Sequence, residues 1–153
     1  MENNIKHSAS DVAKWFLAHN RIKADDEGAD LISNLKLQKL LYYAQGCFLA
    51  INGKPLFGDD ILAWKHGPVV EKVYHEYKQY GANGIEFTDD FNFDDFTKEE
   101  NELLGEVYKT FAQYSAWKLR DMTHEERPWN ETPQNGVISN ELIKEFFQQV
   151  YVE

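Results

Sequence analysis

The chain has 153 residues, 42% of them hydrophobic, which is enough for one compact domain with a buried core and argues against disorder throughout. We expect neither a membrane span nor a secretion signal, because the apolar runs are short and no basic segment precedes an apolar one at the N-terminus. The lone cysteine, Cys47, indicates a reducing cytoplasm, and the net charge of −10 argues against direct nucleic-acid binding, which needs clustered Lys and Arg.

The first predicted helix covers about residues 9 to 20. Ser8 and Asp11 stand three residues apart, in the pattern of a capping box, and apolar residues then recur at helical spacing. The stretch that follows, RIKADDEGAD, is polar throughout most of its length and predicts a loop.

A second helix is predicted to begin at Ser33 or Asn34, either of which can cap its first turn. The pair Asn52-Gly53 supplies a stop signal at its other end. Cys47 lies near the apolar side of this helix and is expected to be a small core residue. The apolar stripe, at positions i, i+3, i+4, i+7 and i+11, consists of Leu37, Leu40, Leu41, Ala44 and Phe48.

Residues 56 to 66 predict either a short strand or hairpin, or an extended pass over the core. Pro68 then suits the first position of a helix, where the N–H that proline lacks would have no intrahelical partner. Gly81 is expected to end this helix. Its apolar face consists of Val69, Val73, Tyr77 and Tyr80.

Residues 82 to 96 predict a turn-rich segment with a strong local charge. Between Glu86 and Glu106 nine acids stand against one base, a net charge of −8. Four phenylalanines alternate with these acids, and we expect some of them to pack onto the core. If the rest stay exposed, the segment presents an acidic and aromatic surface. An acidic and aromatic surface suits docking onto a basic protein, whereas the other interpretation is a solvated connection. The carboxylates assigned to this acidic docking loop are Asp89, Asp90, Asp94 and Asp95.

Two further helices follow the acidic segment. Thr97 and Glu100 form a second capping box, and the inward residues behind it are Leu103, Leu104, Val107 and Phe111. Ser115 caps a short helix that continues to about Thr123. Pro128 is expected to end anything helical before it.

The last predicted helix covers about residues 139–151. Its inward residues are Leu142, Ile143, Phe146, Phe147 and Val150. Together the elements predict a mainly α fold of about six helices with short connections. We expect a single compact domain over residues 1–153, with a core over about residues 8–130.

Two histidine motifs stand out from the helical pattern: His66-Gly67-Pro68 and the segment Thr123–Trp129, THEERPW. Each has a tryptophan nearby, Trp64 or Trp129. One interpretation is structural, because a histidine before a helix can bond an orphan backbone amide. A zinc site would require the fold to bring both imidazoles and a carboxylate together, and acid–base catalysis would require a partner group that the sequence does not identify. We therefore predict no catalytic residue, no metal and no cofactor.

Three segments together carry a family resemblance: NLKLQKLLYYAQG (34–46), GKPLFGDDILAWKHGPVVEKVY (53–74) and SAWKLRDMTHEERPW (115–129). Their ordered motifs KLQKLLYYAQG, AWKHGPVV and THxExPW resemble the Panacea domain of SocA-like, or phage-associated GepA-like, proteins. The resemblance extends from the first helix to about Trp129. Arg127 departs from the family pattern, in which this position often has a small residue. The tail after Asn135 carries no motif of the family.

This resemblance implies an antitoxin of a bacterial or prophage toxin–antitoxin pair. Such a protein neutralises a toxin encoded nearby by direct protein contact, without established enzymatic activity. The family motifs map onto seven residues of the chain: His66, Gly67, Pro68, Thr123, His124, Pro128 and Trp129. With Trp64 and the helix residues Tyr42 and Tyr43, they make up the expected toxin-binding or motif surface.

Two alternatives stay open beside the antitoxin interpretation. One is a phage regulatory or proteolysis-adaptor protein that binds a host factor, and the other is a metal-dependent enzyme that uses His66 and His124. The expected location is cytoplasmic, away from membranes. The expected assembly is a homodimer or a toxin–antitoxin hetero-oligomer.

Overall fold

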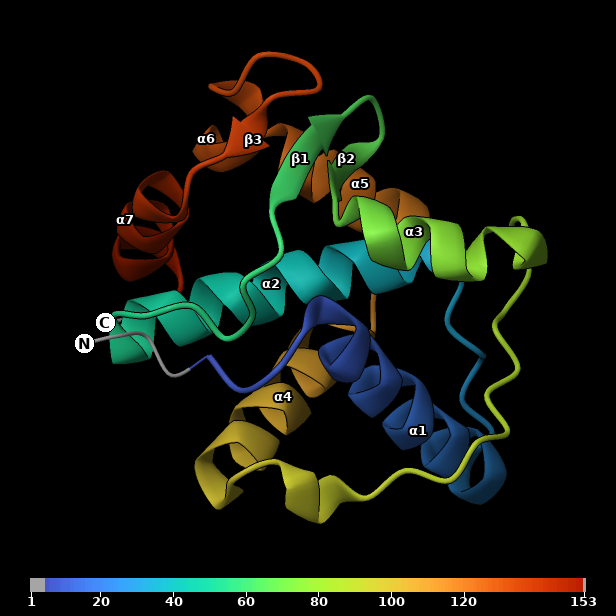
Figure 1. Ribbon diagram of the computed structural model, residues 1–153. Helices are drawn as coiled ribbons and strands as arrows, with labels where there is room; N and C mark the ends of the chain where they lie inside the picture. The colour runs from blue at the N-terminus through green and yellow to red at the C-terminus, as the bar shows by residue number, and fades with distance from the viewer. Residues whose placement is uncertain (1–4, 153) are drawn as a thin grey trace.

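The computed structural model describes residues 5–152, and its ribbon is mainly α, as the sequence predicts (Figure 1). The described residues form seven α-helices, one more than the six predicted: α1 (Ala9–Glu27), α2 (Asn34–Asn52), α3 (Glu71–Tyr77), α4 (Lys98–Phe111), α5 (Ala116–His124), α6 (Arg127–Asn130) and α7 (Asn140–Val150). Three strands, β1 (Ile61–Trp64), β2 (Gly67–Val69) and β3 (Val137–Ile138), form an antiparallel sheet in the order β2-β1-β3. Two short 3-10 helices cover Lys78–Tyr80 and Phe93–Asp95.

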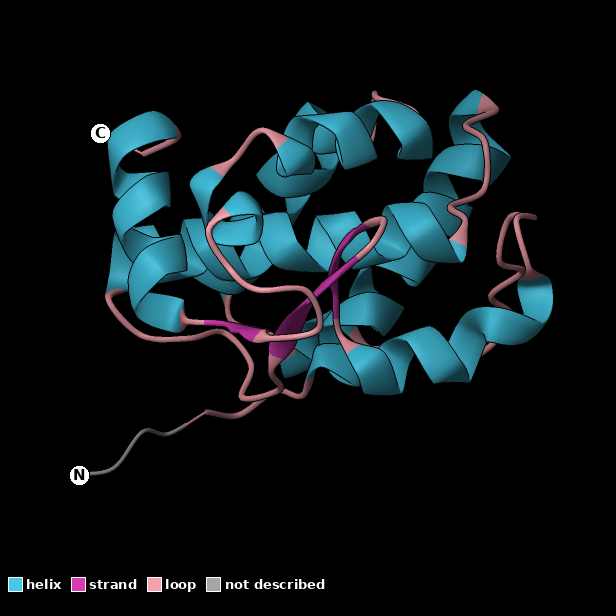
Figure 2. Ribbon diagram, turned by 90° about the horizontal axis from the view of Figure 1, so that it is seen from above, coloured by secondary structure: helices cyan, strands magenta, loops and turns pink. Residues whose placement is uncertain are grey.

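Helix α2 is the centre of the molecule. It packs against α1, α3, α4, α5, α7 and strand β2, with the hairpin, α5 and α7 on one side of it and α1 and α4 on the other (Figure 1). Buried side chains therefore occur on every face of α2 rather than along one stripe. Seen from above, the three short strands lie together among the surrounding helices (Figure 2).

Helix α1 is longer than the sequence predicts. The predicted loop after residue 20 is wrong, because the helix continues to Glu27 and ends only where Gly28 adopts a left-handed conformation with φ 72°. Its extra turns contain Arg, Lys, Ala and Glu, which are good helix formers although they are polar. The start is confirmed: the Ser8 side chain accepts a bond from the Asp11 amide, and the Asp11 carboxylate accepts one from the Ser8 amide, both at 3.1 Å.

The segment before α3 is a β-hairpin. Strands β1 and β2 pair with Ala63 opposite Pro68 and Trp64 opposite Gly67, which leaves Lys65-His66 as the two-residue turn. The prediction that Pro68 begins a helix is therefore wrong. Gly67 has φ 115°, which no helix start allows, and Pro68 lies on an edge strand, where the missing N–H is tolerated. Helix α3 begins at Glu71 instead.

Side-chain caps fix the starts of four further helices where the sequence predicts them. They are provided by Ser33 for α2, Thr97 with Glu100 for α4, Ser115 for α5 and Ser139 for α7. Pro128 lies in the first turn of the short helix α6 rather than beyond the end of a helix, and it is buried there. Val150 was expected to face inward, but it is exposed at the end of α7.

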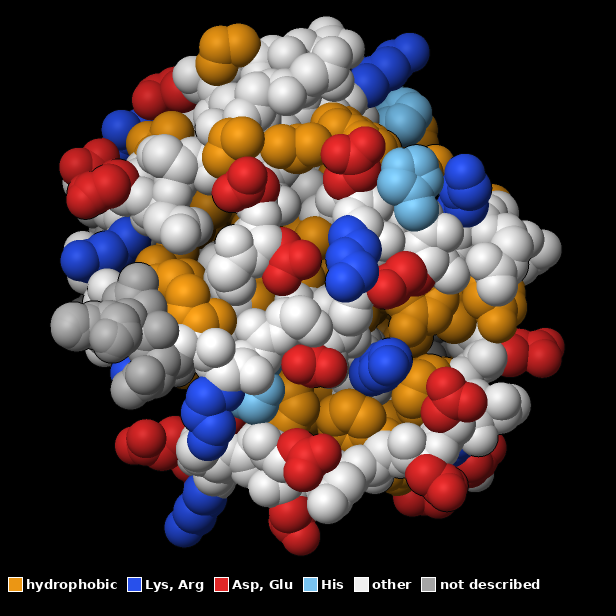
Figure 3. Space-filling view, viewed as in Figure 1, with side chains coloured by type: hydrophobic (Ala, Val, Ile, Leu, Met, Phe, Trp, Pro, Cys, Tyr) orange, Lys and Arg blue, Asp and Glu red, His pale blue; other side chains and the backbone are white. Residues whose placement is uncertain are grey.

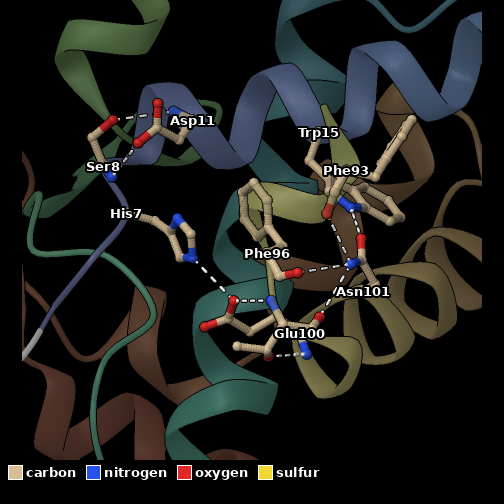
Figure 4. A network of polar contacts seen from close by, with 9 residues as sticks. His7, Ser8, Asp11, Trp15, Phe93, Phe96, Glu100 and Asn101 are labelled. Atoms are coloured by element: carbon tan, nitrogen blue, oxygen red, sulfur yellow. Dashed lines mark hydrogen bonds and ion pairs between the residues drawn. The ribbon is translucent and has the colours of Figure 1, made fainter. Parts of the chain in front are cut away.

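The acidic segment is attached to α1 and α4 by its phenylalanines and by a polar network (Figure 4). Phe87 and Phe96 are buried, and the His7 ring stacks on Phe96 at 4.0 Å between ring centroids. The Asn101 amide donates to backbone carbonyls of this segment and accepts from the Trp15 indole at 2.7 Å. The acids between the phenylalanines stay at the surface. Among the described residues, no helix combines the length and the apolar character that a membrane crossing requires.

Candidate functional site

The two histidine motifs, whose histidines are 58 residues apart in the chain, come close together at the hairpin turn. The Arg120 Nε of α5 donates to His66 Nδ1 at 3.3 Å. Thr123 of the second motif lies against Gly67 of the first, since a Cβ added to Gly67 would lie 3.0 Å from the Thr123 hydroxyl. His66 belongs to the turn, so the interpretation that it caps a helix is wrong.

Lys39 of α2 lies directly beneath this turn. Its side chain is fully buried, and its Nζ donates to the Pro68 carbonyl at 3.3 Å. Burial and the nearby Arg120 guanidinium lower the pKa of Lys39 to about 7. A Cβ on Gly67 would come within 2.5 Å of the Lys39 Cε. The close approach and the positive φ together explain why the motif has glycine at this position.

Trp129 attaches helix α6 to strand β1. Its indole N–H donates to the Trp64 carbonyl at 2.8 Å, and its ring stacks on His124 at 3.9 Å between centroids. Burial, followed by the Arg120 charge, lowers the pKa of His124, which favours the neutral imidazole. The His124 Nε2 atom is buried without a hydrogen-bond partner among the described residues.

A buried carboxylate holds the other end of the THxExPW motif. Glu126 accepts hydrogen bonds from the hydroxyls of Tyr42 at 2.9 Å, Tyr43 at 3.0 Å and Tyr151 at 2.6 Å. Burial raises the pKa of Glu126, and the three hydroxyl donors oppose that rise. The prediction that Tyr42 and Tyr43 lie on a toxin-binding surface is wrong, because both are fully buried by this network.

Two glutamines of the α2 motif complete the buried polar contacts. Gln45 accepts from the Leu56 and Phe57 amides at 2.8 and 3.2 Å and donates to the Phe57 carbonyl at 2.8 Å. Gln38 accepts from the Val70 amide at 2.9 Å. These residues therefore fix the chain before and after the hairpin. We call this set the buried motif network: Gln38, Lys39, Tyr42, Tyr43, Gln45, Gly67, Thr123 and Glu126.

Sequence reasoning missed Gln38, Lys39, Gln45 and Glu126 as a group. The signal that could have identified them is a polar residue within a helix or motif that is otherwise apolar. Such a residue, if buried, needs a specific hydrogen-bond partner. The partners themselves are far away in the sequence, which is why spacing alone does not identify them.

The exposed part of the site is small. Gly67, Pro68, Thr123 and Pro128 are buried, whereas His66 is exposed and Trp117, which the sequence analysis did not select, is 56% exposed. The Arg120 guanidinium lies 4.5 Å from the Trp117 ring centroid. Burial, followed by Arg120 and Lys65, lowers the pKa of His66. We call the accessible set the hairpin corner: Trp64, His66, Trp117, Arg120, His124 and Trp129.

The acidic docking loop is a separate surface. Asp89, Asp90, Asp94 and Asp95 are all exposed. Arg21 of α1 donates to the Phe87 carbonyl at 3.0 Å and so holds the loop on the α1 side of the molecule. In Figure 1 this segment lies below α2, whereas the hairpin lies above it. No group of three His, Cys, Asp or Glu side chains within residues 5–152 is arranged to hold a metal ion.

Comparison with known proteins gives two matches. A family model described as "Antitoxin SocA-like, Panacea domain" matches residues 37–130, which include most of α2, the hairpin, α5 and α6. Antitoxin SocA of Caulobacter vibrioides (strain NA1000 / CB15N) is 50% identical over 56 residues, which cover 37% of this chain and 28% of that protein. No solved structure gives a significant match.

Proposed function

The chain belongs to the Panacea-domain family of SocA-like antitoxins, and on that basis we propose that it binds a toxin protein directly and neutralises it. The partner is a protein encoded nearby, and the encounter takes place in the cytoplasm. A single domain suffices for this role, because neutralisation by binding requires a surface rather than a set of reacting groups. The matched region contains every residue of the hairpin corner.

The observation that carries the proposal is the exposed Trp117 with Arg120 over its ring, beside His66. Tryptophan and arginine are the side chains most enriched at the energetic centres of protein interfaces. A tryptophan that is more than half exposed keeps apolar surface in contact with water in the free chain. A partner that covers this surface gains the free energy of removing it from water. We therefore assign the toxin contact to the hairpin corner.

The acidic docking loop contributes to the encounter rather than to the final contact. Many proteins that act on RNA or nucleotides are basic, and a field from Asp89, Asp90, Asp94 and Asp95 attracts such a partner over several ångströms. Replacing the four aspartates with asparagine should slow association at low salt. An unchanged association rate constant, measured by stopped flow, would remove this part of the proposal.

Growth of cells tests the proposal directly. The neighbouring gene is expressed from an inducible promoter with and without this chain, and the account requires growth arrest that the chain relieves. Trp117→Ala should reduce the rescue, whereas Ile22→Ala, which truncates an apolar side chain 42% exposed on α1, should leave it unchanged. If the neighbour arrests growth and the wild-type chain fails to relieve the arrest, the proposed function is wrong for this pair.

A further inference from the structure

A cavity of about 700 Å³ opens at the other end of α2 from the hairpin turn. It lies between the C-terminal turns of α2, one face of α4, residues 5–7 and the C-terminal residues Tyr151 and Val152. We call it the α4 groove. Its floor is apolar and consists of Cys47, Phe48, Leu103, Val107 and Phe111. Burial raises the pKa of the Cys47 thiol to about 12, so this group is neutral and behaves as part of the apolar floor.

The rim of the groove exposes large apolar side chains. Ile51 is 58% exposed, and Ile5 and Tyr151 are also among the exposed large hydrophobic residues of the described chain. Isolated apolar residues are common on protein surfaces, but three exposed ones around one apolar cavity are the kind of clustering that marks a docking site.

The α4 edge of the groove is acidic. Glu99, Glu102 and Glu106 are spaced i, i+3 and i+7, so they share one face of α4, and all three are exposed. Among the described residues none of them takes part in an ion pair. In the lower part of the face drawn in Figure 3, where Figure 1 places α4 and the acidic segment, apolar side chains lie among several acidic ones, with Lys or Arg and a histidine also beside them.

The wall opposite the acidic edge includes residues 5–7. It is held by contacts that do not involve Glu99, Glu102 or Glu106. His7 Nε2 bonds Glu100 Oε1 at 3.0 Å, and the same carboxylate closes the capping box of α4 (Figure 4). Lys6 and Lys54 also line the groove, on the N-terminal segment and just after α2. The groove is therefore polarised, with its negative side along α4.

We propose that the α4 groove binds an amphipathic basic helix of the partner protein, with apolar side chains on the groove floor and Lys or Arg against Glu99, Glu102 and Glu106. This inference rests on the proposed function, because it names a second contact with the same partner. An amphipathic helix in a hydrophobic groove is a common mode of recognition, and the acidic edge selects a basic one.

Two other occupants fit the groove less well. Residues 1–4, Met-Glu-Asn-Asn, carry an acid and one apolar side chain, so they match neither the floor nor the edge. A second copy of the chain would bring two molecules of net charge −10 together, and like-charged surfaces repel.

A model peptide tests the groove without the toxin. The probe is a labelled peptide of roughly 14 residues, the length of α4, with Leu at helical spacing and Lys elsewhere. Its control has Glu in place of every Lys. We expect fluorescence anisotropy to show binding of the Lys peptide that weakens as salt rises, and binding of the Glu peptide at least tenfold weaker. Equal affinity for both peptides would contradict the proposal.

Matched variants locate the binding. Ile51→Asp should weaken Lys-peptide binding at least tenfold, whereas Ile22→Asp, at the exposed position on α1, should change it less than twofold. The triple variant E99Q/E102Q/E106Q should weaken binding about tenfold and flatten its salt dependence, and D25N/D26N/D30N provides the control at the end of α1 and in the loop after it. All six positions in these triple variants are exposed, so folding should be preserved. Binding unaffected by Ile51→Asp and by E99Q/E102Q/E106Q would overturn the proposal.

The outcomes separate this inference from the proposed function. If the chain fails to relieve growth arrest but the groove variants lose the Lys peptide, the function fails, and only the preference of the groove for a basic amphipathic helix stands. If rescue and peptide binding both persist in Ile51→Asp, the function stands and the groove assignment fails. Sedimentation that shows a dimer of the wild type, dissociated by Ile51→Asp, would identify a second copy as the occupant and contradict the proposal.

Discussion

The hairpin corner and the α4 groove lie toward opposite ends of α2 and are built in opposite ways. Beneath the corner, polar side chains are buried and nearly all have partners, and the family motifs supply most of them. Around the groove, apolar side chains are exposed and carboxylates face solvent. Most of the motif residues beneath the corner therefore stabilise the fold, whereas the groove is formed mostly by residues outside the motifs.

The energetic reason is the cost of burying polar groups. A buried hydrogen-bonding group without its partner costs about 1–3 kcal/mol, so each polar side chain of the buried motif network depends on the group that it bonds. An exposed Ile51 or Trp117 has no such dependence. Four variants, ordered by expected effect on the free energy of unfolding, test this difference.

Gly67→Ala should have the largest effect, about 3 kcal/mol. It combines backbone strain at φ 115° with a Cβ that would lie 2.5 Å from the Lys39 Cε. Urea unfolding followed by circular dichroism measures the loss. The control is Gly105→Ala on α4, where a Cβ meets nothing within 4 Å and helix propensity predicts stabilisation of about 0.5–1 kcal/mol. A loss below about 1 kcal/mol at Gly67 would show that the turn adapts easily.

Glu126→Gln should cost about 2 kcal/mol. Glutamine keeps the shape, but its amide nitrogen cannot accept from the tyrosine hydroxyls that bond Glu126 Oε2. Glu125→Gln, at the exposed neighbouring position, should change stability by less than about 0.5 kcal/mol. Equal effects at the two positions in thermal and urea unfolding would contradict the role assigned to Glu126.

Lys39→Met should remove a pH dependence of stability. In the folded chain Lys39 has a pKa of about 7, against an ordinary value of 10.5. Between these values the unfolded chain binds more protons, so stability rises with pH, by on the order of 1 kcal/mol from pH 7 to 8.5. The free energy of unfolding is measured by urea titration at both pH values. Its increase from pH 7 to 8.5 should be larger by this amount in the wild type than in Lys39→Met. The same pH dependence in both proteins would mean that Lys39 is not the group that titrates.

Ile51→Asp should have the smallest effect on stability, below about 0.5 kcal/mol, because the side chain is already 58% exposed. The free energy of unfolding from urea titration checks this. A loss above about 2 kcal/mol would show that Ile51 belongs to the core and that the groove is not an open surface.

Local hydrogen bonds explain what the sequence predicts well. The caps at Ser8, Ser115 and Ser139 each join residues three positions apart, so spacing alone reveals them. Helix α1 was predicted too short because its last turns are polar, although polar residues such as Lys and Glu favour helix. Pro68 was misplaced because a proline suits a helix start and an edge strand equally well, and only pairing with Ala63 distinguishes them.

Long-range contacts explain what the sequence predicts poorly in the candidate site. Both histidine motifs are selected from the sequence, but the sequence does not predict that Arg120, which lies outside them, bonds His66. Tyr42 and Tyr43 were placed on the surface because their partner, Glu126, lies more than 80 residues away, and no spacing rule joins them. Trp117 is not selected from the sequence, and only the fold shows that it is exposed.

Titration calorimetry with the proposed toxin partner tests the central difference most directly. Trp117→Ala of the hairpin corner and Glu126→Gln of the buried motif network are compared at a temperature where both are folded. The account predicts that Trp117→Ala unfolds like the wild type and binds at least tenfold more weakly, while Glu126→Gln unfolds more easily and keeps the wild-type Kd. The reverse result, with binding lost in Glu126→Gln and retained in Trp117→Ala, would contradict it.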